Sequence, residues 1–576
     1  MRSIPGLLLT VTMIFLLVGT PSIAQHAVQT PSTRDPSDEQ LLVVRIRAPT
    51  PNEALQLIHS GVDLLGARDG TDLFALVTTA EQSTLLAAGW PVQVDTVQTA
   101  QFQHAYLQAF PTGYHSVEEI EAFLYEMAAT YPHLTTLVRF GESWERQHLG
   151  ADYGSDLLAL RLTHHDTPGP KPVFVLLAAI HARELTTAEI AIRFIDYLLT
   201  QYGTDADVTW MLHEHEIVVI PMANPDGRKL AEQGYSQRKN TNYLNGGACA
   251  RPPQERNHSG VDLNRNFAFA WGTIDGPHIS PCRPVYPGPT PASEPETQAL
   301  QAFIRSLYPD HTRPTSAQPA PATTTGILIS LHSYSDLVLW PWGHTTAPTP
   351  NERALVRLGQ RLAQFTGYLP MQSIFLYPTS GTTDDWAYGE LGLASYTFEI
   401  GPYGGICGGF MPPYACIDGN EERHFWAETL PALLYAARVV RAPYREPAGP
   451  DVRDLTVLYD SRVLTLTATL DGHTQPVAGA ELYVGQSSST APIALQPLDG
   501  TFDTVIEQAQ VVLGLPHLNS RNLMDSQNNN EPELLLLVQA YNADGSQGPI
   551  SATWGLATRR WQTWLPLVYQ HETQNF

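Results

Sequence analysis

Apolar and polar residues follow two periodic patterns between about residues 106 and 441 of this chain. Segments with helical periodicity alternate with short, continuous apolar runs, which are typical of buried strands. The runs predict strands at Leu157–Thr163, Val173–Ala179, Ile217–Met222, Gly326–His332 and Ala394–Ile400. The periodic segments predict helices at Val117–Tyr131, Ala188–Gln201, Pro295–Leu307, Glu352–Thr366 and Phe425–Val440. This alternation predicts an α/β sheet with helices on both faces.

Two smaller patterns flank this domain. Residues 41–98 read as strand, helix, two strands, helix and strand, which is the ferredoxin-like α+β order. A Pro/Gly-rich linker is expected at residues 442–452, and short β-type runs in residues 453–570 predict a small β-sandwich. The first unit is either a pro-segment or a plain accessory domain. The second lacks clustered titratable residues, so we expect a passive appended domain, with adhesion or carbohydrate binding as the alternative.

The first 24 residues have the features of a secretory signal. One positive charge at Arg2 precedes an apolar stretch from Leu7 to Val18, and small residues lead to a cleavage point after Ala24. The alternative is an uncleaved membrane anchor, although the stretch is short for a span and no later one is long enough. Residues 25–40 are polar and rich in Pro, Ser and Thr, which predicts a flexible lead. We therefore expect a secreted protein.

Composition narrows the class of protein. A chain of 576 residues is too long to fold around a single hydrophobic core, so two to four domains are expected. A hydrophobic content of 43% with 16% charged residues describes a globular chain, and a formal net charge of −24 argues against nucleic-acid binding. In an exported chain four cysteines suggest disulfides, with three connectivities open. Pairing neighbours gives Cys249–Cys282 and Cys407–Cys416; the lack of a C-x-x-C spacing argues against a four-cysteine zinc site.

A candidate metal site begins at the end of the second apolar run. His181 and Glu184 stand three residues apart at a strand-to-helix junction, a spacing that can turn both side chains the same way. His332, at the end of another run, supplies a third ligand and leaves a fourth zinc position open to water. Competing histidines at His164-His165 and in His213-Glu214-His215 are interpreted as non-ligands, the second pair as a solvated strand edge. Glu399, alone in an apolar strand, is the candidate general base.

Six motifs then carry a resemblance to a known family. The chain resembles the funnel-type zinc carboxypeptidases, namely the pancreatic A and B enzymes and the bacterial carboxypeptidase T. The motifs occur in the family's order within residues 106–441, and they are His181-Ala182-Arg183-Glu184, Asn224-Pro225-Asp226-Gly227, Gly260-Val261-Asp262-Leu263-Asn264-Arg265-Asn266, Leu331-His332-Ser333-Tyr334, Tyr377-Pro378-Thr379-Ser380-Gly381-Thr382-Thr383-Asp384-Asp385-Trp386 and Thr397-Phe398-Glu399. The resemblance implies a mixed central sheet, one Zn²⁺ per catalytic domain, and hydrolysis of the last peptide bond of peptides and proteins.

The resemblance also assigns roles to single residues. His181, Glu184 and His332 match the zinc ligands, Glu399 matches the base, and Arg238 matches the arginine that polarises the scissile carbonyl. The remaining matches concern substrate and support. Asn264, Arg265 and Tyr377 match the residues that hold the terminal carboxylate, Arg183 matches a contact further along the substrate, and Asp262 matches the carboxylate behind the first zinc histidine.

The sequence leaves alternatives open for the preferred C-terminal residue and for the activity itself. Asp384 falls at the floor of the family's primary pocket, which favours C-terminal Lys or Arg as in the B enzymes; carboxypeptidase T has an acid there and accepts apolar ends. Gln237 replaces the usual aromatic residue, and Cys407 and Cys416 alter the loop after Glu399. A catalytically silent peptide-binding protein, or an enzyme acting on cell-wall peptides that end in a diamino acid, are the competing hypotheses.

Overall fold

The computed structural model describes residues 40–105, 110–274, 276–311, 315–419, 422–460, 463–485, 491–514, 523–525 and 532–555. The predicted signal segment, nearly all of the flexible lead and residues 556–570 of the predicted β-sandwich lie outside these ranges. No helix in the described ranges is long and apolar enough to cross a membrane.

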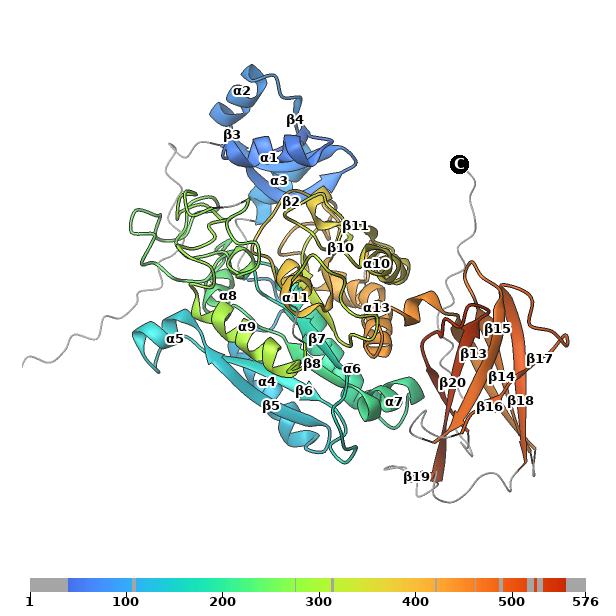
Figure 1. Ribbon diagram of the computed structural model, residues 1–576. Coiled ribbons are helices and arrows are strands. Elements are labelled where there is room, and N and C mark those ends of the chain that lie inside the picture. Colours follow the sequence, from blue (N-terminus) through green and yellow to red (C-terminus); the bar gives the residue numbers. More distant parts are fainter. Residues whose placement is uncertain are drawn as a thin grey trace, which may run out of the picture. The chain divides into compact units, whose positions relative to one another are not determined.

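An eight-stranded mixed sheet forms the centre of the largest part of the chain (Figure 1). Its order is β11-β10-β12-β9-β7-β8-β6-β5. Pairing is parallel along β12-β9-β7-β8 and between β10 and β11, and it is antiparallel between β10 and β12, between β8 and β6 and between β6 and β5. The strands are β5 (Thr135–Glu142), β6 (Asp156–Leu162), β7 (Val173–Leu177), β8 (Glu216–Ile220), β9 (Ile327–His332), β10 (Leu337–Trp340), β11 (Leu369–Gln372) and β12 (Ala394–Glu399). The expected α/β class with a mixed central sheet is confirmed.

Helices cover both faces of this sheet because its central strands are apolar on both sides. In β7, Phe174 and Leu176 enter one core, and Val173, Val175 and Leu177 enter the other, as the two-residue period of a strand requires. The first core takes in side chains of α6 (Leu185–Gln201), α7 (Ala206–Glu214), α10 (Glu352–Thr366) and α13 (Phe425–Val439); the second takes in α9 (Pro295–Leu307) and α11 (Thr383–Leu391). The remaining helices of this part are α4 (Val117–Thr130), α5 (Trp144–Leu149), α8 (Pro225–Glu232) and α12 (Ala415–Asp418), with short 3-10 turns η1 (Leu263–Arg265) and η2 (Ser373–Phe375).

Parallel pairing brings several strand ends to the same edge of the sheet. Glu399 at the end of β12 lies in register with His332 at the end of β9, and β9 also pairs with β7, which leads to His181. The turn after β7 is held by Thr187, whose hydroxyl accepts from Ala179 N (3.1 Å) and donates to Glu184 O (2.8 Å). Chemistry-bearing residues therefore gather where the strands end, as is usual in α/β sheets.

Residues 41–94 fold as the expected ferredoxin-like module. Its four strands follow the order β2-β3-β1-β4, and two helices close the pattern. Both helices begin with a capping box, Thr50 with Glu53 and Thr78 with Glu81, which satisfies amide groups at each helix start. The elements are β1 (Leu41–Arg47), α1 (Pro51–His59), β2 (Asp63–Asp69), β3 (Asp72–Thr78), α2 (Thr79–Ala87) and β4 (Val92–Val94), followed by α3 (Thr96–Ala105).

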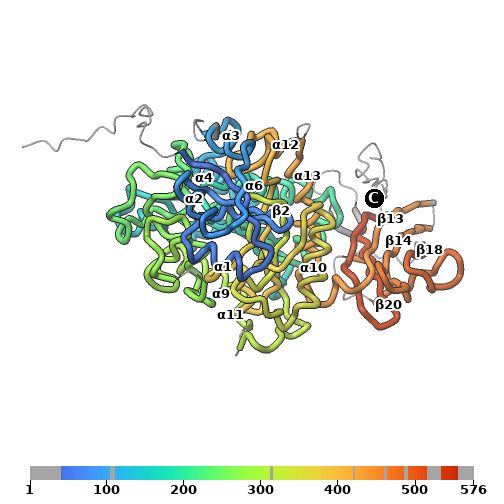
Figure 2. Tube along the Cα trace, turned by 90° about the horizontal axis from the view of Figure 1, so that it is seen from above, coloured from blue at the N-terminus to red at the C-terminus, as the bar shows by residue number. Residues whose placement is uncertain are grey.

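Two further sheets form the β-sandwich near the C-terminus, in the orange-to-red segment of Figure 2. One sheet contains β13 (Asp451–Asp460), β14 (Val463–Asp471), β18 (Ile506–Gly514) and β17 (Gln496–Pro497); the other contains β16 (Ile493–Ala494), β15 (Val477–Val484), β20 (Pro532–Asn542), β19 (Leu523–Asp525) and β21 (Ser551–Trp554). The inward residues of both sheets share one core. The first strand begins inside the expected linker, directly after the short turn η3 (Glu446–Ala448).

The interpretation of the second histidine pair is wrong. His213 belongs to the last turn of α7, and His215 follows it as the helix cap, so neither lies on a solvated strand edge. Both are buried, and the ring nitrogens of His213 bond Thr167 (3.0 Å) and Tyr202 (3.0 Å). Burial lowers the pKa of His213 to about 3. Apolar residues from Val208 to Leu212 recur at helical spacing directly before the pair, and this pattern predicts the helix.

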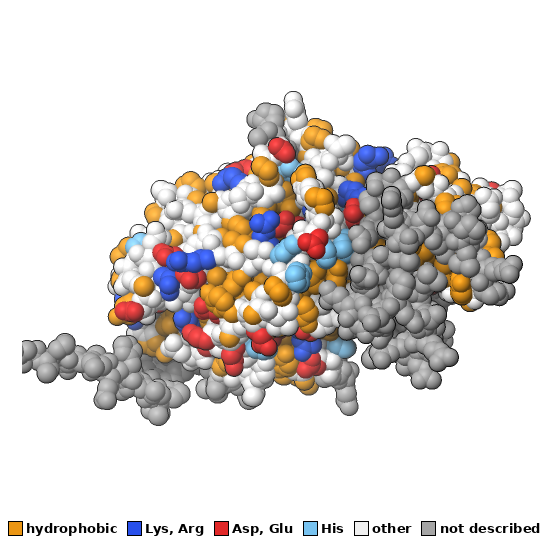
Figure 3. Space-filling view, turned by 90° about the horizontal axis from the view of Figure 1, so that it is seen from below, with side chains coloured by type: hydrophobic (Ala, Val, Ile, Leu, Met, Phe, Trp, Pro, Cys, Tyr) orange, Lys and Arg blue, Asp and Glu red, His pale blue; other side chains and the backbone are white. Residues whose placement is uncertain are grey.

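The four cysteines pair as neighbours. Cys249 bonds Cys282 with Cα atoms 5.2 Å apart, and Cys407 bonds Cys416 with Cα atoms 5.7 Å apart. Each bond closes a loop beside the end of the sheet that carries the candidate ligands. On the face seen in Figure 3, acidic, basic and apolar side chains are interspersed and no basic field stands out.

Candidate active site

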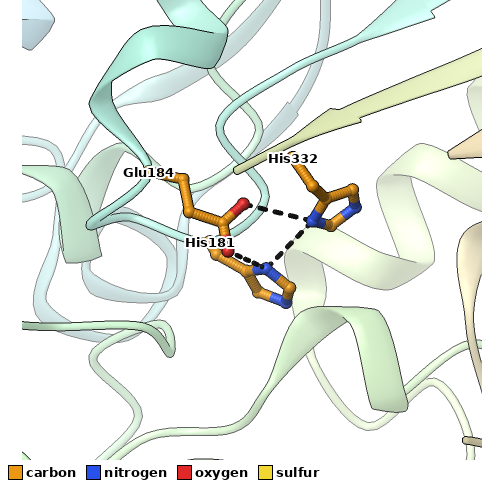
Figure 4. A group of neighbouring side chains, drawn as sticks. All are labelled: His181, Glu184 and His332. Atoms are coloured by element: carbon orange, nitrogen blue, oxygen red, sulfur yellow. Dashed lines mark hydrogen bonds and ion pairs between the residues drawn. The ribbon is translucent and has the colours of Figure 1, made fainter. Parts of the chain in front are cut away.

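Three side chains from two strand ends face one another at the edge of the sheet (Figure 4). His181 Nδ1 lies 2.7 Å from Glu184 Oε1, and His332 Nδ1 lies 3.0 Å from His181 Nδ1 and 3.2 Å from Glu184 Oε2. All three residues are buried. The three residues that the sequence predicts as ligands are therefore brought together. Within the described residues, these three possible metal ligands form a group whose donor atoms lie close together.

The electrostatics of the group favour a cation. Burial alone would raise the pKa of Glu184, but the neighbouring His181 and His332 outweigh it and hold this pKa well below its usual range. The carboxylate is thus ionised, and two imidazole nitrogens face the same point. Two nitrogens and a carboxylate are the donor set of an open zinc site. The residues present fit Zn²⁺.

The far nitrogen of each histidine is also held. His181 Nε2 lies 3.1 Å from Asp262 Oδ1, and His332 Nε2 lies 3.0 Å from Ser330 Oγ. Such partners fix which nitrogen faces the metal and raise the basicity of the ligand. Asp262 is where the resemblance expects it. Ser330 was missed, although its position two residues before His332 in a strand places both side chains on one face.

Glu399 lies in the same pocket, at the end of β12. Burial first, and then the negative charge of Glu184, raise the pKa of Glu399 well above its usual range, while Arg238 and Arg265 act in the opposite direction. A carboxyl group in this setting takes up a proton readily, which is what a general base must do.

Arg238 lies on the opposite wall of the ligand group. Its Nε donates to Asp262 Oδ2 (2.9 Å), and its Nη1 lies 3.8 Å from Glu184 Oε1. The guanidinium is thereby oriented beside the metal ligands, and Arg238 lines the same pocket. A fixed cation at this position can stabilise negative charge that develops on a substrate oxygen.

Asn264, Arg265 and Tyr377 form the next group along the pocket. Arg265 Nη1 donates to Asn264 O (2.9 Å), and Arg265 Nη2 donates to Tyr377 Oη (3.1 Å). Asn264 Oδ1 accepts from Thr383 N (2.9 Å), which leaves the amide nitrogen on the pocket side, 3.5 Å from His332 Nε2. A planar guanidinium beside an amide and a phenol is suited to bind a carboxylate.

Asp384 is buried and lines the same pocket. Its Oδ2 accepts from Ser373 Oγ (2.9 Å), and its backbone oxygen accepts from Ser395 Oγ (2.8 Å). The lining of the same pocket also includes the uncharged residues Leu339, Ser373, Leu376, Thr379, Thr382 and Thr397. A fixed, buried carboxylate can pair with a basic side chain that enters the pocket.

Arg183 is held by other side chains of the protein, and its contact with substrate stays a prediction. Its Nη1 donates to Glu255 Oε1 (2.7 Å) and to Ser236 Oγ (3.2 Å), and its guanidinium lies over the ring of Phe410 at 3.9 Å. Glu255 was missed, since it stands in a Pro-rich loop with no periodicity or motif.

Comparison with known proteins agrees with this geometry. Residues 120–427 match the family model described as zinc carboxypeptidase. This match spans more than half of the chain and contains every residue of the site except Leu65 and Gly66, which line the pocket from the N-terminal module. The chain belongs to the zinc carboxypeptidase family.

Individual relatives point the same way. The chain is 29% identical to a zinc carboxypeptidase of Saccharothrix mutabilis subsp. capreolus over 406 residues, covering 66% of this chain and 86% of that protein. It is 31% identical to carboxypeptidase A2 of Mus musculus over 328 residues, covering 55% and 69%. The crystal structure of carboxypeptidase A from Helicoverpa armigera shares the fold, with a TM-score of 0.54 at 23% identity over 69% of this chain and 98% of that one. The protein is a zinc-dependent peptide hydrolase, a metallocarboxypeptidase.

Removing the Ser330 hydroxyl tests its support of the metal site. We expect Ser330→Ala to weaken zinc affinity about tenfold or more, because His332 loses the partner that fixes its tautomer. Zinc retained during dialysis against a graded chelator series measures this. Ser333→Ala is the matched control, since the Ser333 hydroxyl is buried without a hydrogen bond to any described residue. Equal zinc retention in both variants would contradict the assigned role.

Proposed function

We propose that this protein is a secreted carboxypeptidase that removes the C-terminal residue of peptides, with Glu399 as general base. The observation that carries the proposal is the position of Arg265, in one pocket with the His181, Glu184 and His332 group and with Glu399. A terminal carboxylate bound at Arg265 places the last peptide bond beside the base. This geometry favours an exopeptidase.

The residues divide the work as follows. When bound, zinc supplies Lewis acidity that polarises the scissile carbonyl and makes water more acidic. Glu399 accepts the proton of the attacking water and returns it to the leaving amine. Arg238 stabilises the negative charge on the carbonyl oxygen. Arg265, Asn264 and Tyr377 hold the terminal carboxylate, so the bond to be cut stays in register with the base.

Asp384 supports a preference for basic C-terminal residues. It is a buried acidic residue of the pocket in which the side chain of the last residue would lie. The leucines and threonines of the same pocket also offer apolar surface, so we propose that Lys and Arg are preferred and that apolar residues are accepted.

The N-terminal module supports a zymogen. Leu65 and Gly66 of β2 line the pocket of the metal ligands, and Gly66 O accepts from Ser335 Oγ (3.1 Å). Arg68 Nε donates to Leu376 O (3.1 Å), directly before Tyr377, and Tyr377 itself packs against the module's core. A substrate that needs this space must displace the module, so we propose that residues 41–98 are an inhibitory pro-segment.

Secretion and the catalytic role of Glu399 extend the proposal beyond the family assignment. The signal-like N-terminus and the two disulfide bonds both suit an oxidising compartment. A silent binding protein is disfavoured, because such a protein has no use for a buried carboxylate opposite the metal ligands.

The base is tested by Glu399→Gln. We expect hydrolysis to fall by several orders of magnitude, since an amide cannot accept the proton, while zinc content is unchanged. Glu390→Gln is the control, because Glu390 pairs with Arg305 and does not line the pocket. Chelation should abolish activity and added zinc should restore it; activity that survives complete metal removal would contradict the proposal.

Exchanging the buried carboxylate tests specificity. In Asp384→Asn, kcat/KM for peptides ending in Arg should fall about a hundredfold, because an ion pair is lost in a buried site. The value for the same peptides ending in Phe should change by less than about threefold. Equal losses on both peptides would show that Asp384 only supports the structure.

Release of the module tests the zymogen. The chain has no lysine or arginine between Arg68 and Arg139, so trypsin cannot cut the connection to the catalytic domain. Limited digestion with chymotrypsin, which cuts after aromatic residues, should raise activity about tenfold or more as the competent fraction grows. Mass spectrometry should then find a new N-terminus between residues 102 and 114. Full activity in protein that still begins at Gln25 would refute the pro-segment.

A further inference from the structure

The loop from Ala250 to His258 is held in a fixed conformation. The Cys249–Cys282 bond anchors its start, and Ala250 N donates to Asn257 Oδ1 (3.0 Å). Gln254 and Asn257 form a backbone bridge, and His258 Nδ1 lies 2.9 Å from Gln254 O. A side chain presented by such a loop is positioned before any ligand arrives.

This loop directs Glu255 toward Arg183. Both side chains are nearly inaccessible, at 3% and 4% exposure, and their Oε1 and Nη1 atoms are 2.7 Å apart. Phe410 covers the other side of the guanidinium. The positive charge of Arg183 is therefore balanced by Glu255 and shielded by an aromatic ring.

A cavity of about 90 Å³ lies next to this pair. It shares Leu65 and Phe410 with the pocket of the metal ligands, so the two cavities adjoin, and Asp384 lines only the first. Its walls from the catalytic domain are Gly234, Ser236, Glu255, Tyr334, Gly408, Gly409, Phe410 and Met411, and the module adds Val43, Leu65, Gln98, Gln101 and Phe102. Among these lining residues Glu255 alone carries a charge, and Arg183 is not one of them.

We propose that Glu255 determines specificity for residues upstream of the scissile bond, so that substrates with a basic residue there are preferred and acidic ones are rejected. The inference rests on the proposed function and extends it beyond the C-terminal residue. An approaching side chain meets the carboxylate of Glu255 and not the guanidinium of Arg183.

The setting strengthens this discrimination. The rest of the wall is uncharged, and a charge that is 3% exposed is screened less than one on an open surface. The chain's formal net charge of −24 acts in the same direction, since it attracts basic peptides and repels acidic ones.

The neighbouring Arg256 provides a matched control. It lies on the same loop but turns to the module, where its Nη1 and Nη2 bind Glu81 (2.5 and 2.8 Å) and its Nε lies 3.5 Å from Asp63. It does not line the cavity or the pocket of the metal ligands. Arg256→Gln therefore perturbs the loop without removing the proposed determinant.

The experiment compares three peptide series on the zinc-loaded full chain, before and after digestion with chymotrypsin. All peptides end in the same C-terminal residue, and they carry Lys, Gln or Glu at one of the three preceding positions. For at least one position, kcat/KM should be about tenfold or more higher with Lys than with Glu. Glu255→Gln should reduce that ratio to near one or invert it, because Arg183 is then uncompensated. Glu255→Asp and Arg256→Gln should keep a ratio well above one.

Each outcome decides the question. Equal rates for Lys and Glu peptides in the wild-type protein, with good hydrolysis of the Gln series, would overturn the inference and leave the proposed function standing. An unchanged ratio in folded Glu255→Gln would overturn it as well. If Glu255→Gln does not fold, the wild-type ratio and the Glu255→Asp variant still decide. Failure to hydrolyse the Gln series at all would refute the proposed function, and the inference with it.

Discussion

One carboxylate, Asp262, holds the active site together. Its Oδ1 binds His181 Nε2 (3.1 Å) and accepts from Asn264 N (3.0 Å), and its Oδ2 accepts from Arg238 Nε (2.9 Å). Burial alone would raise the pKa of Asp262, but Arg238 and His181 hold it well below its usual range. The same ionised group thus orients the metal ligand His181, the neighbouring Arg238 and the turn that presents Arg265. A buried charge of this kind is tolerated only because it is fully paired.

The sheet supplies the rigidity that this polar group needs. β7 and β8 are buried along their whole length, and their neighbours pack helices on both faces. The polar residues are confined to the strand ends and the loops that follow, where backbone groups are no longer needed for the ladder. Apolar packing therefore fixes the positions from which His181, His332 and Glu399 reach one another.

The N-terminal module and the disulfide-linked loops complete the surroundings of the site. Tyr377 touches Arg265 on one side and the module's core on the other. The loop that carries Glu255 toward the cavity carries Arg256 toward the module. Substrate-binding surface and module-binding surface are therefore built from adjacent residues, which links the chemistry of the pocket to the presence of the module.

The sequence by itself determined much of this protein. Apolar runs and helical periods located α9 and α10 to the residue. Ordered motifs identified the family and predicted the three side chains that converge at the strand ends. Local rules sufficed there, because strand burial and ligand spacing are properties of short segments.

Only the tertiary structure decided the contacts between distant segments. Three contacts depend on how loops and modules pack, and no local sequence pattern encodes them. Glu255 neutralises Arg183, Ser330 holds His332, and Leu65 lies against the metal pocket. His213 and His215 show the same limit, since their burial comes from helices and strands that meet around them. Sequence fixes which chemical groups are present at the strand ends; packing decides which of them face one another, because the partners lie tens to hundreds of residues apart.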